Sequence, residues 1–228
     1  MIDQKKMKQL NEVFEMSPLR HNYSYYGNEE IKEELLYRVV SKSITLIIGG
    51  RGFGKTALLK HIINNFGGKN RILYLNSNRP YDLEKMLKNK KNMILLFDNV
   101  SFLKKSEIER IKYYYDEDIL DSIVFTTESK DILSFSDSMW SRIGKNIIEL
   151  KETSFLEFKE MMIERLGEDN VFNDESLSIV YNISKDNKFR LLTCKRVYEY
   201  LLNSNHEEFD ENLVLEMLKK YKKSLEEQ

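Results

Sequence analysis

The apolar residues of this chain follow two different periods, and the changes between them predict its helices and strands. Short runs of β-branched and large apolar residues are typical of strands buried on both faces of a parallel sheet. Five segments fit this pattern, Ile44–Ile48, Arg71–Leu75, Met93–Phe97, Ser122–Thr126 and Asn146–Leu150. Helical spacing of apolar residues separates them, at Glu29–Val40, Lys55–Asn65, Tyr81–Asn89, Ser106–Tyr115 and Lys130–Trp140. Strands that alternate with helices predict an α/β fold with a five-stranded parallel sheet flanked by helices.

The two ends of the chain have helical patterns only. Residues 1–16 predict an amphipathic helix, and no strand pattern returns after Leu150. Ser154 and Glu157 have the spacing of a capping box, which predicts a helix start. Further helices are expected at Asp174–Ser184, Arg190–Asn203 and Glu211–Leu225. We therefore expect an α/β domain over residues 1–150, with an N-terminal helical segment 1–40, and an α-helical domain over residues 151–228.

The charge balance excludes one way of binding nucleic acid. The 36 Lys and Arg residues nearly cancel the 37 Asp and Glu residues, which leaves a formal net charge of -1 over 228 residues. An overall positive field that grips DNA is therefore absent, and DNA contact would need a local basic stripe, repeated around an oligomer. The single cysteine, Cys194, forms no internal disulfide, and the apolar runs are too short to span a bilayer. We expect a cytoplasmic protein without a membrane segment.

One glycine-rich stretch carries specific chemistry. It consists of Gly49, Gly50, Arg51, Gly52, Phe53, Gly54, Lys55 and Thr56, and it lies between an expected strand and an expected helix. That context is the one a phosphate-binding P-loop requires, because glycines let backbone N–H groups turn inward and the helix N-terminus adds partial positive charge. We expect this loop with Ala57 to hold ATP or ADP. Lys55 would neutralise the β- and γ-phosphates, and the Thr56 hydroxyl would ligate Mg²⁺.

The second half of the expected metal site is an acidic residue at the end of another buried strand. Asp98 follows Met93–Phe97 and would hold Mg²⁺ through water, as a Walker-B aspartate does. The next residue is Asn99, where many such ATPases have a glutamate that polarises the attacking water. An amide orients water but takes no proton, so we expect slow hydrolysis or a carboxylate elsewhere, such as Glu128.

Taken in order, these residues resemble the AAA+ ATPases. The resemblance covers residues 14–205 and is greatest to the branch that contains the Orc1/Cdc6 initiators and the related archaeal STAND-type ATPases. Residues 148–158 also resemble the STAND-type ATPases, so the resemblance leaves open which of the two groups is nearer. It implies the strand order 5-1-4-3-2, a helical lid domain after the α/β body, and ATP held between them. Initiators of this type usually carry a winged-helix domain after the lid, and we expect none after residue 205.

The resemblance also implies roles for residues outside the P-loop. Tyr26 lies in the segment that touches adenine, and Thr126 or Thr127 lies where the family places sensor 1. Arg142 matches the arginine finger, which acts on a neighbouring subunit. The alternative is an ordinary surface arginine or an ion pair inside the subunit. Arg190 matches the sensor-2 arginine, although Asn187-Lys188 replaces the Gly-Asp of initiators, and its alternative role is that of an ordinary helix-start arginine.

For function, the resemblance implies an ATP-controlled switch in a DNA transaction, such as helicase loading, replication initiation or transposition targeting. Its partners would be further copies or a related AAA+ subunit, DNA and a DNA-processing protein. A second reading is a regulatory or scaffold protein whose assembly is set by ATP with negligible hydrolysis, which Asn99 favours. A third is a P-loop kinase for a small molecule, against which the strand–helix count and Arg142 argue.

Overall fold

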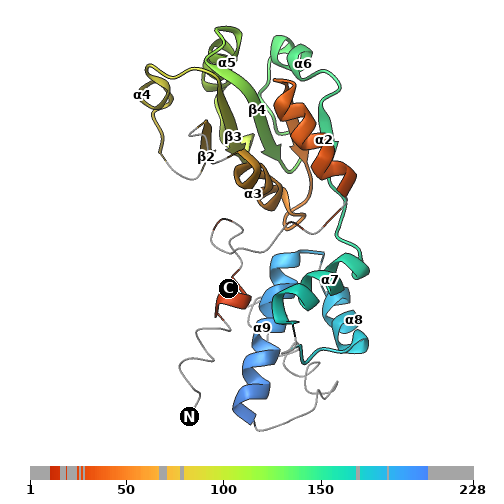
Figure 1. Ribbon diagram of the computed structural model, residues 1–228. Helices are drawn as coiled ribbons and strands as arrows, with labels where there is room; N and C mark the ends of the chain where they lie inside the picture. The colour runs from red at the N-terminus through yellow and green to blue at the C-terminus, as the bar shows by residue number, and fades with distance from the viewer. Residues whose placement is uncertain are drawn as a thin grey trace. The chain divides into compact units, whose positions relative to one another are not determined.

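The computed structural model describes residues 11–15, 19, 25, 27, 29–66, 71–77, 80–167, 170–183 and 185–204. By its internal contacts the chain divides into two compact units (Figure 1). One unit is Gly27–Glu152, and the other joins Met1–Tyr26 to Thr153–Gln228. The domain boundaries predicted from the sequence, near residue 151, stay a prediction.

The Gly27–Glu152 unit contains one parallel sheet. Its strands are β1 (Ile44–Ile48), β2 (Ile72–Asn76), β3 (Met93–Asp98), β4 (Leu120–Thr127) and β5 (Ile147–Glu149). They are ordered β2-β3-β4-β1-β5, and every neighbouring pair is parallel. The prediction of five parallel strands in the order 5-1-4-3-2 is therefore confirmed.

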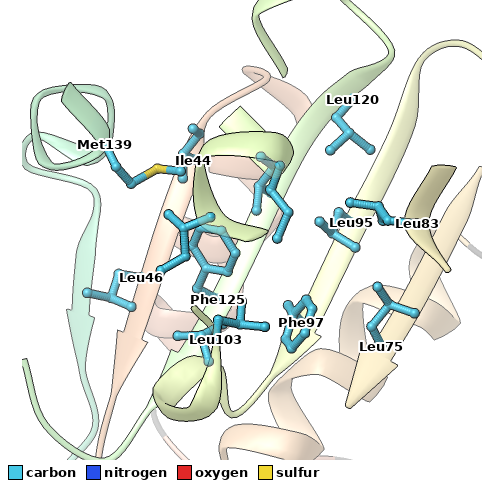
Figure 2. Close-up of a cluster of buried hydrophobic side chains, with 14 of the residues drawn as sticks. Ile44, Leu46, Leu75, Leu83, Leu95, Phe97, Leu103, Leu120, Phe125 and Met139 are labelled. Carbon is cyan, nitrogen blue, oxygen red and sulfur yellow. The ribbon is translucent and has the colours of Figure 1, made fainter. Parts of the chain in front are cut away.

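Helices cover both faces of this sheet. They are α2 (Glu29–Val40), α3 (Lys55–Phe66), α4 (Leu83–Leu87), the 3-10 helix η2 (Val100–Phe102), α5 (Lys105–Asp116) and α6 (Asp137–Ile143). One face packs against α4, α5 and α6, and the labelled residues of Figure 2 include Ile44, Leu46, Leu95, Phe97, Phe125 and Met139 from this core. The buried apolar residues of α2 and α3 lie outside that cluster, namely Leu35, Val39, Leu58, Leu59 and Ile62. Since α2 and α3 contact β1, β3 and β4, these two helices cover the opposite face.

The helix predicted over Lys130–Trp140 is wrong over residues 130–136. Helix α6 begins only at Asp137, where the Ser136 hydroxyl accepts a hydrogen bond from the Met139 N–H. The preceding segment places the Phe135 ring between Phe125 and Trp140, with centroids 5.4 and 5.3 Å away. Packing of this aromatic side chain against the sheet core outweighs the local helical pattern.

The second unit contains the helices α7 (Phe155–Leu166), α8 (Asp174–Ile183) and α9 (Asn187–Ser204). The predicted capping box at Ser154 and Glu157 is confirmed, with each side chain accepting a hydrogen bond from the other's N–H. Phe14 is buried in the core of these helices, and burial raises the pKa of the Cys194 thiol in the same core. The helix predicted at Glu211–Leu225 lies outside the described residues. In the described part of the chain, no helix has the length and apolarity needed to cross a membrane.

Candidate functional site

The loop between β1 and α3 has a backbone that requires its glycines. Gly52 and Gly54 have φ values of 79° and 89°, in the left-handed region that side chains rarely tolerate. A Cβ atom at Gly49 would lie 2.9 Å from Leu150 Cβ, and one at Gly50 would lie 3.0 Å from Phe53 Cζ. The loop is therefore closely packed at Gly49 and Gly50, where a side chain would meet Leu150 or Phe53.

Lys55 is the first residue of α3 and lies over this loop. Its ammonium donates hydrogen bonds to the carbonyl oxygens of Gly49 at 2.6 Å and Gly50 at 2.8 Å. An ammonium has three donors and a flexible stem, so it can exchange these carbonyls for phosphate oxygens with little movement. The loop, the helix N-terminus and Lys55 together fit the phosphates of a nucleotide.

Asp98 lies at the end of β3 and is only 6% exposed. Its Oδ2 atom accepts hydrogen bonds from the hydroxyls of Thr56 at 2.8 Å and Tyr74 at 2.9 Å. Its Oδ1 atom accepts one from the Thr126 hydroxyl at 2.8 Å. The structure thus brings together the two predicted metal ligands, Thr56 and Asp98, and surrounds the carboxylate with hydroxyl groups.

This donor set suits Mg²⁺. A hydroxyl and a carboxylate are hard oxygen ligands, and Mg²⁺ commonly takes one or two protein ligands while water and phosphate supply the rest. Thr56 Oγ1 and Asp98 Oδ2 lie 2.8 Å apart, beside the loop that fits the phosphates. Both residues therefore fit the roles predicted for them.

Asn99 follows Asp98 in a left-handed conformation, with φ 63° and ψ 82°. Its N–H donates to the Thr126 hydroxyl at 2.8 Å, which holds the peptide in this conformation. Its side-chain oxygen accepts a hydrogen bond from the Ser101 N–H at 3.4 Å and so caps η2. Asn99 stands where many such ATPases have a catalytic glutamate. In this structure its carboxamide stabilises the start of η2.

The two sensor-1 candidates lie on opposite faces of β4, because side chains alternate along a strand. Thr126 shares a face with Asp98 and bonds to it. The Thr127 hydroxyl instead donates to the Ser129 carbonyl at 2.9 Å and lies 3.2 Å from Ser101 Oγ. Of the pair, only Thr126 contacts the predicted metal ligand. Glu128 is exposed just after the strand.

Arg142 lies near the end of α6 and pairs with Asp116 at the end of α5. Its Nε and Nη2 atoms each donate to one carboxylate oxygen at 2.8 Å, and Nη1 donates to the Ser138 carbonyl at 2.9 Å. The hydrogen bonds to Asp116 raise the pKa of Arg142. Both residues precede strands, so they lie at the amino edge of the sheet, away from the loop at its carboxyl edge. Arg142 therefore does not meet the P-loop of its own chain, and its role as a finger stays a prediction.

Arg190 belongs to the helical unit and is 1% exposed. Its Nε donates to the Tyr181 carbonyl at 3.0 Å, and its Nη1 donates to Asn187 Oδ1 at 2.9 Å. The guanidinium carbon lies 3.8 Å from the centroid of the Tyr181 ring. These contacts anchor the start of α9, and the sensor-2 role stays a prediction.

Two further observations concern tyrosines. Tyr26, the predicted adenine contact, lies outside the described residues, while burial beside Glu157 raises the pKa of its neighbour Tyr25 to about 12. The sequence placed Tyr74 on a strand and assigned it no role, whereas the structure brings its hydroxyl to Asp98. The sequence signal that could have found this contact is that Tyr74 lies on β2, the neighbour of the strand β3 that ends in Asp98.

Comparisons with known proteins agree with this geometry. The family model described as "AAA domain" matches residues 41–161, which is more than half of the chain. Among solved structures, Cdc6p from Pyrobaculum aerophilum has 13% identity and a TM-score of 0.69, covering 87% of this chain and 67% of that one. Domain III of the replication initiation protein DnaA from Thermotoga maritima has 22% identity and a TM-score of 0.66, covering 96% and 98%.

A third structure, Aeropyrum pernix Orc1 in complex with DNA, has 13% identity and a TM-score of 0.67, covering 90% of this chain and 68% of that one. At these identities the likeness shows a shared fold, which is the α/β P-loop fold with a following helical part that the resemblance implied. No curated protein sequence matches the chain.

Proposed function

Because this chain belongs to the AAA domain family of P-loop ATPases, we propose that it is an ATP-controlled switch in a DNA transaction. Residues 49–57 hold ATP or ADP in this proposal, and Thr56 and Asp98 hold Mg²⁺. The observation that carries it is the hydrogen bond between the Thr56 hydroxyl and the Asp98 carboxylate, at the start of the helix whose Lys55 ammonium lies over the loop.

Each of these groups has a separate task. The loop N–H groups and Lys55 bind and neutralise the phosphates. Thr56 and Asp98 would hold Mg²⁺, which would supply neutralisation of the phosphate charge. The Thr126 hydroxyl donates to Asp98 Oδ1 and accepts from the Asn99 N–H, so it links the carboxylate of Asp98 to the residue that precedes η2.

The switch would act through contacts with other molecules. Arg142 lies at the far edge of the sheet, where it is available to a neighbouring copy or a related AAA+ subunit once it leaves Asp116. The DNA part of the proposal is supported by the shared fold with Cdc6p, DnaA domain III and Orc1, of which the last was solved with DNA. Helicase loading, replication initiation and transposition targeting are the transactions that we consider.

The test measures ATP binding and turnover of the full chain with and without duplex DNA. We expect Mg²⁺-dependent ATP binding that Lys55→Ala abolishes, and turnover that DNA stimulates. Glu128→Gln tests the exposed carboxylate that follows β4, and unchanged turnover would leave Glu128 without a catalytic role. Transfer of the γ-phosphate to a metabolite, or absence of ATP binding, would refute the proposal.

One observation favours a second function. The Asn99 carboxamide caps η2 and offers no proton acceptor to water. This geometry supports a regulatory or scaffold protein whose assembly follows ATP binding with negligible hydrolysis. Tight ATP binding with no turnover, with or without DNA, and an ATP-dependent change of mass in solution would support this function over the first.

A further inference from the structure

We propose that Tyr74 is a positioning residue for the magnesium site, which holds the Asp98 carboxylate in its metal-binding orientation. This inference rests on the proposed nucleotide and Mg²⁺ site and adds a residue to it. The Tyr74 hydroxyl donates to Asp98 Oδ2 at 2.9 Å.

The register of the sheet explains why this tyrosine reaches the carboxylate. Strands β2 and β3 are parallel, with Tyr74 opposite Leu96 and Asn76 opposite Asp98. Residues two positions apart on a strand share a face, so Tyr74 and Asp98 point to the same side of the sheet. The long tyrosine side chain spans the step between the two rows and places its hydroxyl on the carboxylate, whereas a shorter side chain at this position would stop before it.

The three hydroxyls on Asp98 are not equivalent. The Thr56 oxygen is itself a predicted metal ligand, so it changes its surroundings when Mg²⁺ binds. Tyr74 and Thr126 are not among the predicted metal ligands, and each donates to a different carboxylate oxygen, Oδ2 and Oδ1 respectively. Together they set the plane of the carboxylate independently of the metal. Groups that orient a metal ligand in this way contribute about 10–100-fold to metal affinity.

The test is a Mg²⁺ titration of nucleotide binding to the full chain, with N-methylanthraniloyl-ATP as the fluorescent probe. In Tyr74→Phe we expect the Mg²⁺ concentration at half-saturation to rise by about 10-fold or more, because the hydroxyl that orients Asp98 is lost. Probe affinity in EDTA is expected to stay at the parental value, because the loop and Lys55 are unchanged. Tyr74→Met also removes the hydroxyl and is expected to give the same shift of the Mg²⁺ midpoint. If one of the two variants folds poorly, the other still tests the role of the hydroxyl.

The chain offers a matched control in Tyr81→Phe. The Tyr81 hydroxyl also makes a partly buried hydrogen bond to a carboxylate, donating to Glu107 at 2.7 Å, but its ring packs on Phe97 in the core on the other face of the sheet. We expect the Mg²⁺ midpoint of this variant to equal that of the parent.

The outcomes separate this inference from the function beneath it. An unchanged Mg²⁺ midpoint in the Tyr74 variants would overturn the positioning role and leave the proposed function standing. An equal loss of probe affinity with Mg²⁺ and in EDTA would also overturn it, because it would show a general effect on the loop. A parent chain that binds the probe without any response to Mg²⁺ would overturn the metal site itself.

Discussion

Replacement of Thr126 by valine tests the hydrogen-bond network around Asp98 directly. Thr126 is fully buried, and its hydroxyl both donates to Asp98 Oδ1 and accepts from the Asn99 N–H, each at 2.8 Å. Valine has nearly the same shape and suits a strand at least as well, so the substitution removes the hydroxyl with little change of packing.

The magnitude follows from the two bonds. Loss of a hydrogen bond to a charged group costs about 1.5–3 kcal/mol, and a buried N–H left without an acceptor costs about 1–3 kcal/mol. Some of this free energy is recovered when Asn99 relaxes from its left-handed conformation. We therefore expect Thr126→Val to lower the free energy of unfolding by about 2–4 kcal/mol.

The assay is urea unfolding of parent and variant without nucleotide, followed by circular dichroism, with comparison of midpoints and slopes. Thr127→Val is the matched control, since Thr127 is equally buried but its hydroxyl contacts neutral groups, the Ser129 carbonyl at 2.9 Å and the Ser101 hydroxyl at 3.2 Å. Loss of the Thr127 hydroxyl is expected to lower the free energy of unfolding by about 1 kcal/mol. A Thr126 variant no less stable than the Thr127 variant would refute the argument that Thr126 supports the charged carboxylate.

Three other predictions follow from the remaining site residues. Asn99→Ala is expected to destabilise the chain by about 1–2 kcal/mol in urea unfolding through loss of the η2 cap and strain at positive φ, and Asn99→Gly by less; equal losses would argue against the left-handed backbone. If Arg142 acts as an arginine finger, Arg142→Ala abolishes ATP turnover and Asp116→Ala preserves it. If Arg142 and Asp116 form only an exposed ion pair, both variants leave turnover unchanged and alter the free energy of unfolding by less than about 1 kcal/mol. Arg190→Lys keeps the charge but loses the planar fork of the guanidinium and its stacking on Tyr181. Thermal unfolding without nucleotide is expected to show a free energy of unfolding lower by about 2–3 kcal/mol. An unchanged melting temperature with weakened ATP binding would instead support a sensor-2 role.

The amino-acid sequence by itself determined the strands and the phosphate loop. Buried parallel strands are short apolar runs, so β1 and β3 were visible without tertiary information. The loop was visible because its glycines meet a local backbone requirement, at Gly52 and Gly54 through positive φ. The capping box at the start of α7 is local in the same sense, since it joins residues three positions apart.

Only the tertiary structure decided which side chains meet at the site. The Tyr74 and Thr126 hydroxyls reach Asp98 from neighbouring strands, through a register that no local pattern encodes. The start of α6 depended on where Phe135 packs against the sheet, and the partner of Arg142 depended on the meeting of two helix ends. A local backbone requirement determines which residue types stand next to one another, so it can be recognised in the sequence. Hydrogen bonds between strands depend instead on how distant segments pack, and the sequence alone could not predict them.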